Sequence, residues 1–200
     1  MVKVGSLHDF RRFIQLLAAN VAQTLDYSHY ARDIGVSVNT IKSWLSILEI
    51  SYIVFTLPAY SSNLRKRIVK SPKVYFYDTG LVTHLTGIEN MKQFESNIMG
   101  GTLFENYVIS EIVKNNYHHQ LNQQFYFLRT HDGMEIDLII EHKQQRTLIE
   151  IKRSATFNPS MVRHLKTFRE ASDHCILLYN GETLPEGETR ITNYRDYLTE

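Results

Sequence analysis

Two short stretches of the chain, residues 135–140 and 148–152, alternate charged and apolar side chains with a period of two. This period is typical of β-strands, in which successive side chains point to opposite faces. If the two strands pair, Asp137, Glu150 and Lys152 meet on one face of the sheet, opposite a face of Ile and Leu. Two carboxylates and one ammonium are costly to bury on an apolar sheet without further partners. A divalent cation would be such a partner, so the pattern predicts a sheet that carries a metal-competent site.

Composition restricts the class of protein. With 200 residues, of which 43% are hydrophobic, the chain is long and apolar enough to form one or two packed domains. Its single cysteine, Cys175, excludes an internal disulfide and fits a reducing compartment. The start of the chain lacks the apolar region of a signal peptide, and no apolar run reaches the roughly 18 residues that a membrane helix needs. We therefore expect a soluble cytoplasmic protein that has no membrane partner.

The first half of the chain has the pattern of a winged helix-turn-helix. Apolar residues recur at helical spacing in three segments, and Gly35 permits the turn between the second and third of these. Two β-prone runs follow and are separated by Pro58 and a polar segment, as in the hairpin that forms a wing. The expected elements are helices over residues 7–25, 27–34 and 38–50 and strands over residues 52–57 and 73–77.

Basic side chains are concentrated in this half, mainly between the two β-prone runs. Such a cluster can straddle phosphates and gives sequence-independent, salt-dependent affinity for DNA. Two interpretations stay open, because winged helices also join protein to protein and a run of charges is often a solvated face. The candidate nucleic-acid-binding residues here are Arg65, Lys66, Arg67, Lys70 and Lys73, with Lys42 on the exposed side of the third helix.

The second half predicts a helix, three strands, a helix and a further strand. Gly100-Gly101 is expected to close a linker, and Asp132-Gly133 to supply a tight hairpin turn. After the last strand the sequence predicts only a polar tail. The expected helices begin at residue 102 and at Asn158-Pro159, and the expected strands cover residues 125–128, 135–141, 148–152 and 175–179. The predicted fold class is therefore α/β (α+β), with a winged-helix domain over residues 1–95 and an αβββαβ domain over residues 96–200.

This arrangement resembles the core of the PD-(D/E)XK nuclease superfamily, which has a restriction-endonuclease-like fold. The resemblance rests on a carboxylate in the leading helix, Glu105, then Asp137 in the second strand and Glu150-x-Lys152 in the third. It implies that these four residues are catalytic, that Asp137, Glu150 and Glu105 bind Mg²⁺ or Mn²⁺, and that Arg129 contacts a phosphate. Ile136 stands where the superfamily's motif has proline.

A wider resemblance covers most of the chain. Several motifs together are similar to the C-terminal domain of unknown function found behind AAA+ ATPase modules in bacteria and archaea. None of the nine glycines lies in a phosphate-binding loop of the Gly-x-x-x-x-Gly-Lys-Ser/Thr type, so no ATPase activity is expected from this chain alone. The resemblance implies an AAA+ ATPase domain as partner, in cis or in trans. The motifs are residues 45–49, 66–81, 104–106, 129–130, 135–137 and 150–152.

Three functions remain open from the sequence. The chain is a metal-dependent DNA endonuclease, or it is an inactive nuclease fold and winged helix that binds DNA or protein and regulates an attached ATPase. In the third interpretation, Glu150 and Lys152 simply pair with each other and with Asp137, and the group is wholly structural. Similarity of fold does not choose among them, because one fold hosts many activities.

The basic cluster gives a first testable prediction. Duplex DNA should bind with an affinity that falls as salt rises, and replacing Arg65, Lys66 and Arg67 with alanine should weaken binding because phosphate contacts are lost. Each lost contact should reduce the slope of log affinity against log salt by about 0.9. Fluorescence anisotropy at several salt concentrations measures this slope. Binding that ignores both salt and these substitutions would contradict the prediction.

Overall fold

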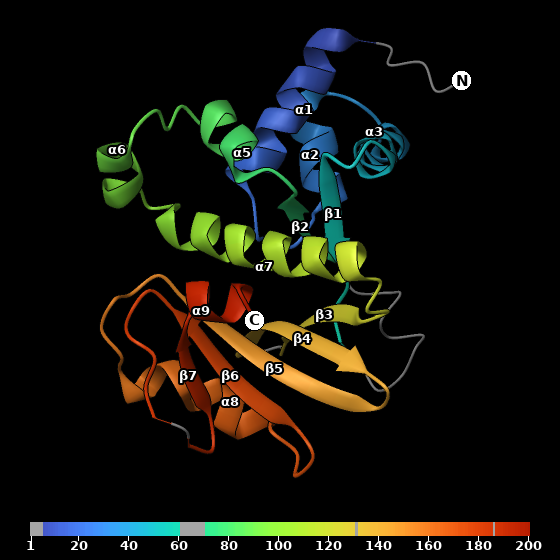
Figure 1. Cartoon of the computed structure of the whole chain (residues 1–200). Helices are drawn as coiled ribbons and strands as arrows, with labels where there is room; N and C mark the ends of the chain where they lie inside the picture. Colours follow the sequence, from blue (N-terminus) through green and yellow to red (C-terminus); the bar gives the residue numbers. More distant parts are fainter. Residues whose placement is uncertain (1–5, 61–70, 131, 186) are drawn as a thin grey trace. The chain divides into compact units, whose positions relative to one another are not determined.

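The chain folds into two compact units, each described here by itself from a computed structural model (Figure 1). The structure describes residues 6–60, 71–130, 132–185 and 187–200. The first unit contains residues 6–57 and 71–106 of this set, and the second contains residues 58–60 and those from 107 onward. The fold is a mixed α/β one with two separate sheets.

Three helices open the first unit, and polar side chains cap each of them. Ser6, Asp26 and Ser37 accept hydrogen bonds from backbone N–H groups of the first turns, which have no partner inside a helix. Gly35 ends the second helix in the left-handed region at φ 85°. The helices are α1 (Leu7–Ala19), α2 (Tyr27–Ile34) and α3 (Val38–Ile50). The first is shorter than predicted, and the other two are confirmed.

A two-stranded antiparallel sheet follows, as the sequence predicts. Strand β1 (Val54–Leu57) pairs with β2 (Lys73–Phe76), with Phe55 opposite Tyr75. Two short helices that the sequence pattern did not predict come next, α5 (Thr79–Leu85) and α6 (Met91–Ser96). Buried residues of the three opening helices, both strands and α5 form one apolar core.

Helix α7 (Gly100–His119) begins earlier than predicted. The expectation that Gly100 and Gly101 close a linker is wrong, because both lie in its first turn. Backbone hydrogen bonds decide a helix end more strongly than the weak helix propensity of glycine, which costs only about 1 kcal/mol per residue. The two compact units divide within this helix, after Asn106, whereas our sequence boundary falls between residues 95 and 96.

A buried asparagine fixes the start of α7 to β2 inside the first unit. Asn106 is fully buried, and its Oδ1 accepts a hydrogen bond of 2.8 Å from the backbone N–H of Phe76. Its Nδ2 donates to the carbonyl oxygen of Phe76 at 3.2 Å and to Oγ1 of Thr79 at 3.0 Å. The amide thus takes the place of a neighbouring strand, because it pairs with both backbone groups of one residue.

The second unit is built on a five-stranded mixed sheet with the order β3-β4-β5-β6-β7 (Figure 1). The first three strands are antiparallel, and β6 and β7 run parallel to β5. Lys143 and Gln144 join β4 to β5 with positive φ angles of 47° and 66°, as a tight two-residue hairpin requires. The strands are β3 (Gln124–Arg129), β4 (Glu135–His142), β5 (Gln145–Lys152), β6 (His174–Tyr179) and β7 (Arg190–Asn193).

Residues 58–60 extend this sheet beyond β3. The backbone N–H of Tyr60 donates to the carbonyl oxygen of Phe127 at 2.6 Å, and the N–H of Phe127 donates to the carbonyl oxygen of Pro58 at 3.0 Å. The guanidinium of Arg146 lies 5.3 Å from the centre of the Tyr60 ring and is held by Asp173. The chain that leaves β1 therefore belongs to the second unit and covers part of the β3 edge.

Helical residues after β5 pack on one face of the sheet. The 3₁₀ turn η1 (Pro159–Val162) begins at the predicted cap Asn158 and leads into α8 (Arg163–Phe168). Val162 and Leu165 share an apolar core with Ile136, Ile139 and Leu177 of the strands. The expectation of a polar tail is wrong, because β7 and α9 (Tyr194–Leu198) follow β6. Four residues are too few for their alternation to be recognised in the sequence.

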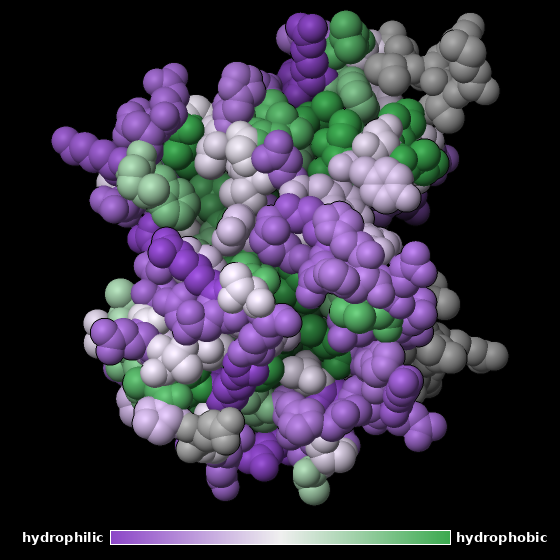
Figure 2. All heavy atoms as spheres, in the orientation of Figure 1, coloured by the Kyte–Doolittle hydropathy of each residue, from purple (hydrophilic) through white to green (hydrophobic). Residues whose placement is uncertain are grey.

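On the face shown in Figure 2, hydrophilic residues predominate in the second unit, and hydrophilic and hydrophobic areas alternate in the first. Within the described parts of the chain, no helix combines the length and the apolar character needed to cross a membrane.

The Asn106 contact gives a prediction about stability. Asn106→Ala should lower the free energy of unfolding by about 2–4 kcal/mol, because two backbone groups of the buried Phe76 lose their partners. Asn115→Ala, at an exposed position of the same helix, is the matched control and should change stability by no more than about 0.5 kcal/mol. Urea unfolding monitored by circular dichroism compares them. Equal stabilities of the two variants would contradict the prediction.

Candidate functional site

The antiparallel ladder between β4 and β5 ends before either strand does. Its last pair is Leu138 with Ile149, although β4 begins at Glu135 and β5 continues to Lys152. Beyond this pair, β4 stays hydrogen-bonded to β3, and β5 stays hydrogen-bonded to β6. The two strands therefore form a fork, which we define as residues 135–137 of β4 and 150–152 of β5.

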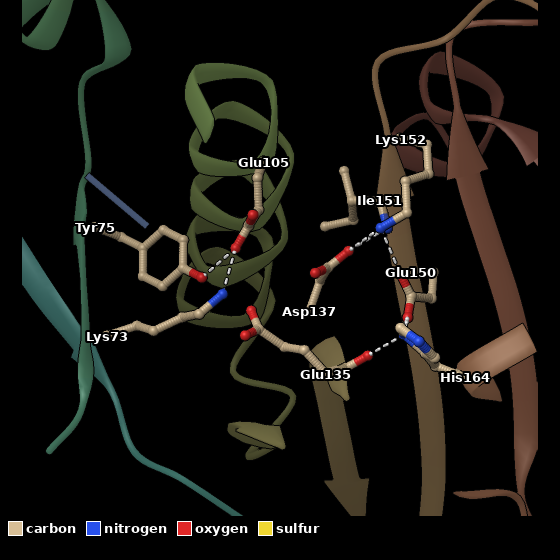
Figure 3. Close-up of polar contacts among 9 residues, drawn as sticks. All are labelled: Lys73, Tyr75, Glu105, Glu135, Asp137, Glu150, Ile151, Lys152 and His164. Atoms are coloured by element: carbon tan, nitrogen blue, oxygen red, sulfur yellow. Dashed lines mark hydrogen bonds and ion pairs between the residues drawn. The ribbon is translucent and has the colours of Figure 1, made fainter. Parts of the chain in front are cut away.

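Side chains occupy this fork in place of the missing ladder. The carboxylate oxygen Oδ2 of Asp137 accepts a hydrogen bond of 2.8 Å from the backbone N–H of Ile151. Lys152 places its ammonium 3.1 Å from the same Asp137 oxygen and 2.5 Å from Oε2 of Glu150 (Figure 3). The structure thus brings Asp137, Glu150 and Lys152 together, as the alternation of charged and apolar residues predicts.

Glu150 is the least compensated of these groups. Its side chain is 2% exposed, and its Oε1 has no hydrogen-bond partner among the described residues. Burial raises the pKa of Glu150, and the negative charge of Asp137 raises it further. The ammonium of Lys152 acts in the opposite direction, but the pKa still rises to about 8. Two carboxylates therefore share one ammonium, and the cluster favours one additional positive charge.

Lys152 keeps its proton in this environment. Burial lowers its pKa, but the charges of Asp137 and Glu150 outweigh burial, so that the pKa lies above the ordinary lysine value. The side chain is 37% exposed, so its ammonium reaches both the carboxylates and solvent. In this state Lys152 is a cation that can stabilise negative charge and is not a proton acceptor.

His164 completes the group and is not among the site residues expected from the sequence. It lies in α8, and its Nδ1 is 3.1 Å from the carbonyl oxygen of Glu135 and 3.5 Å from Oε1 of Glu150 (Figure 3). The sequence holds a weak signal for this position. His164 follows Met161 by three residues and precedes Phe168 by four, so it shares the inner side of the helix with both.

Glu105 has partners of its own within the first unit. Its Oε1 accepts hydrogen bonds from the Lys73 ammonium at 3.0 Å and from the Tyr75 hydroxyl at 2.6 Å (Figure 3). Lys73 is only 2% exposed, so its ammonium faces this carboxylate and does not offer its charge to a phosphate at the surface. The role of Glu105 as a metal ligand stays a prediction.

The remaining candidates belong to other elements than the forked ends of β4 and β5, or lie outside the described residues. Arg129 is exposed, and its guanidinium is 3.6 Å from the carboxylate of Glu135. Lys42 is exposed on α3, with its ammonium 5.6 Å from the centre of the Tyr27 ring. Both positions are open to solvent, which a phosphate contact requires. Four predicted phosphate contacts lie outside the described residues: Arg65, Lys66, Arg67 and Lys70.

The donor set at the fork is small. Within the part of the chain that the structure describes, no group of three or more His, Cys, Asp or Glu side chains is arranged to hold a metal ion. Asp137 and Glu150 supply two carboxylates. Mg²⁺ is often bound by one or two carboxylates, with water and substrate phosphate as its other ligands. The fork therefore fits a hydrated hard cation better than a dehydrated, protein-enclosed one.

Comparison with known proteins finds two domain families in tandem. Residues 1–92 match the model of a domain of unknown function, DUF8612, and residues 100–197 match that of another, DUF4143. The DUF4143 match contains the fork, His164 and the whole five-stranded sheet.

Two mycobacterial proteins are similar over most of the chain. They are the uncharacterized proteins Mb2031c of Mycobacterium bovis and Rv2008c of Mycobacterium tuberculosis. Each is 31% identical to this chain over 157 residues, which make up 78% of the chain and 34% of the relative. The chain thus spans about a third of the length of the curated relatives that it matches.

The raised pKa of Glu150 predicts a pH dependence of stability. Because the folded-state pKa of about 8 lies above the ordinary value of 4.5, the folded state holds more protons than the unfolded state between these pH values. The stability due to this group is therefore full below pH 4.5 and is lost as pH rises through 8. Without divalent cations, wild type should lose on the order of a few kcal/mol relative to Glu150→Gln over this range.

Urea unfolding in the presence of a chelator, at pH values from 4.5 to 8.5, measures this difference. Glu182→Gln, at an exposed position, is the control and should follow wild type throughout. A constant difference between wild type and Glu150→Gln would show that Glu150 is charged in the folded state at all of these pH values.

Proposed function

We propose that the second unit is a nuclease-type module that hydrolyses phosphodiester bonds of DNA with the help of Mg²⁺ or Mn²⁺. The observation that carries this proposal is the charge balance of the fork, where two buried carboxylates share one ammonium and Oε1 of Glu150 has no hydrogen-bond partner among the described residues. A wholly structural ion pair would be expected to satisfy its buried oxygens. A bound divalent cation would supply the missing positive charge and would give Oε1 of Glu150 a partner.

Each side chain of the fork has a task under this proposal. Asp137 and Glu150 would hold the cation, which when bound supplies an activated water and stabilises developing negative charge. The Ile151 N–H fixes the orientation of the Asp137 carboxylate. Lys152, kept protonated by its two carboxylate neighbours, would orient the attacking water or stabilise charge on the phosphate. Arg129, which is exposed at the end of β3, is proposed to contact a neighbouring phosphate.

A second candidate is supported by the same residues. Lys152 already lies close to both carboxylates, and Glu105 is hydrogen-bonded to Lys73 and Tyr75. These contacts favour a module without catalysis, in which the nuclease-like unit and the helix-turn-helix unit bind DNA or protein and regulate an ATPase. The order of α1, α2, α3 and the β1–β2 hairpin supports the winged-helix assignment of the first unit.

Both candidates include an AAA+ ATPase as partner. DUF4143 is typically associated with AAA+ ATPases, and the mycobacterial relatives are about three times as long as the matched region. We propose that this chain acts together with such an ATPase domain, either in the same polypeptide or in a separate one. The ATPase would provide movement or assembly, and the fork would provide the site that acts on DNA.

Metal binding gives the first test. Mn²⁺ or Mg²⁺ should raise the melting temperature of wild type by several degrees, because a ligand at about 100 times its Kd adds about 2.7 kcal/mol to stability. Asp137→Asn should show no such shift. Its amide oxygen can still accept the Ile151 hydrogen bond, so the variant removes the charge and keeps this contact. Equal shifts in melting temperature for wild type and Asp137→Asn would contradict the proposed metal site.

An assay of DNA cleavage distinguishes the active nuclease from the module without catalysis. Supercoiled plasmid and single-stranded DNA are incubated with Mn²⁺ and either wild type or Lys152→Met, which keeps the length of the side chain and removes its charge. For a nuclease, Lys152→Met should lower the cleavage rate by about 100-fold or more. Metal binding by a wild type that cleaves neither substrate would support the inactive module.

A further inference from the structure

The two carboxylates of the fork, Asp137 and Glu150, are held in place to different degrees. Asp137 is fixed by the Ile151 N–H and by Lys152, whereas Oε1 of Glu150 has no hydrogen-bond partner among the described residues. Since the β4–β5 ladder ends at Leu138 and Ile149, backbone pairing does not set the spacing between the two carboxylates. The Lys152 ammonium joins Oδ2 of Asp137 to Oε2 of Glu150, but it leaves the position of Oε1 of Glu150 to a further contact.

His164 makes that contact from outside the two strands. Its Nδ1 lies within hydrogen-bond distance of the Glu135 carbonyl oxygen on β4 and 3.5 Å from Oε1 of Glu150 on β5 (Figure 3). A carbonyl oxygen only accepts hydrogen bonds, so Nδ1 carries the hydrogen in this arrangement. The imidazole nitrogen therefore lies between the two strands: its hydrogen is donated to the Glu135 carbonyl oxygen of β4, and Oε1 of Glu150 on β5 lies 3.5 Å from it.

The packing of α8 holds the imidazole there. Leu165, the next residue, is fully buried in the core that includes Ile136 and Leu148 of the forked strands. The His164 side chain itself is 30% exposed, so it lies at the rim of the fork and reaches solvent. The rigid core thus fixes where the imidazole lies, while the polar contacts act at the rim.

We infer that His164 is a positioning residue for the metal site, through its Nδ1–H and not as a ligand. The inference rests on the proposed function. With Nδ1–H anchored on the Glu135 carbonyl, the imidazole keeps Oε1 of Glu150 at a fixed distance from β4, and therefore from the Asp137 carboxylate. Contacts of this kind around metal ligands commonly change affinity by about 10–100-fold when removed.

Three substitutions of His164 test whether it positions Glu150 through its Nδ1–H group. The amide nitrogen of asparagine is as many bonds from the backbone as Nδ1 of histidine, and that of glutamine is as many as Nε2. His164→Asn therefore keeps a donor at the Nδ1 position, and His164→Gln moves it to the Nε2 position. His164→Phe keeps a ring of similar size and removes both nitrogens.

The experiment measures Mn²⁺ affinity of the full chain by titration calorimetry and by the electron paramagnetic resonance signal of free Mn²⁺. We expect His164→Phe and His164→Gln to bind about tenfold more weakly or worse, and His164→Asn to stay within about threefold of wild type. Circular dichroism and metal-free melting temperatures establish that each variant is folded. If His164→Phe does not fold, the Mn²⁺ affinities of His164→Asn and His164→Gln are compared with each other to test the positioning role.

Each other outcome has a definite meaning. Wild-type affinity in His164→Phe or in His164→Gln, with binding lost in Asp137→Asn, would overturn the positioning role and leave the metal site intact. Binding by His164→Asn as weak as that of His164→Gln would also overturn it, because a donor at the Nδ1 position would then be insufficient. No binding of Mn²⁺ by wild type would overturn the metal site, and the role of His164 with it.

Discussion

The separation of β4 from β5 beyond Leu138 and Ile149 is the constraint on which the polar chemistry of the second unit depends. Backbone groups that leave a ladder in a protein interior need other partners. The Asp137 carboxylate provides one for the Ile151 N–H, and this requires a charged group to be buried between two strands. The buried negative charge of Asp137 needs a positive charge close to it, and the ammonium of Lys152 supplies this charge.

The same constraint explains why this cluster differs from the buried ion pair of the first unit. There, Glu105 meets the ammonium of Lys73 and the hydroxyl of Tyr75, so one carboxylate has one cation and a further donor. In the fork, Glu150 adds a second carboxylate to the one ammonium of Lys152. A buried cluster that is short of positive charge raises the pKa of its most buried acid or attracts a cation, and both follow from the same electrostatic field.

Several motifs that seemed to belong to one site divide between the two units. Phe104-Glu105-Asn106 and the run around Lys73 and Tyr75 hold α7 against β2, because Asn106 pairs with the backbone of Phe76. Asp137 and Glu150-x-Lys152 lie in the second unit. The residue spacing in the sequence therefore brought these side chains together as candidates, but it did not show which of them share partners.

The sequence by itself determined the strands except β7, and the meeting of Asp137, Glu150 and Lys152, because side-chain direction in a strand has a fixed period of two and a hairpin fixes the register. It determined α2 and α3 for a similar reason, since apolar spacing and cap residues are local. Only the tertiary structure decided the end of the β4–β5 ladder, the place of His164 and the partners of Glu105. These depend on contacts between elements far apart in the chain, which packing of the whole core sets and no local pattern records.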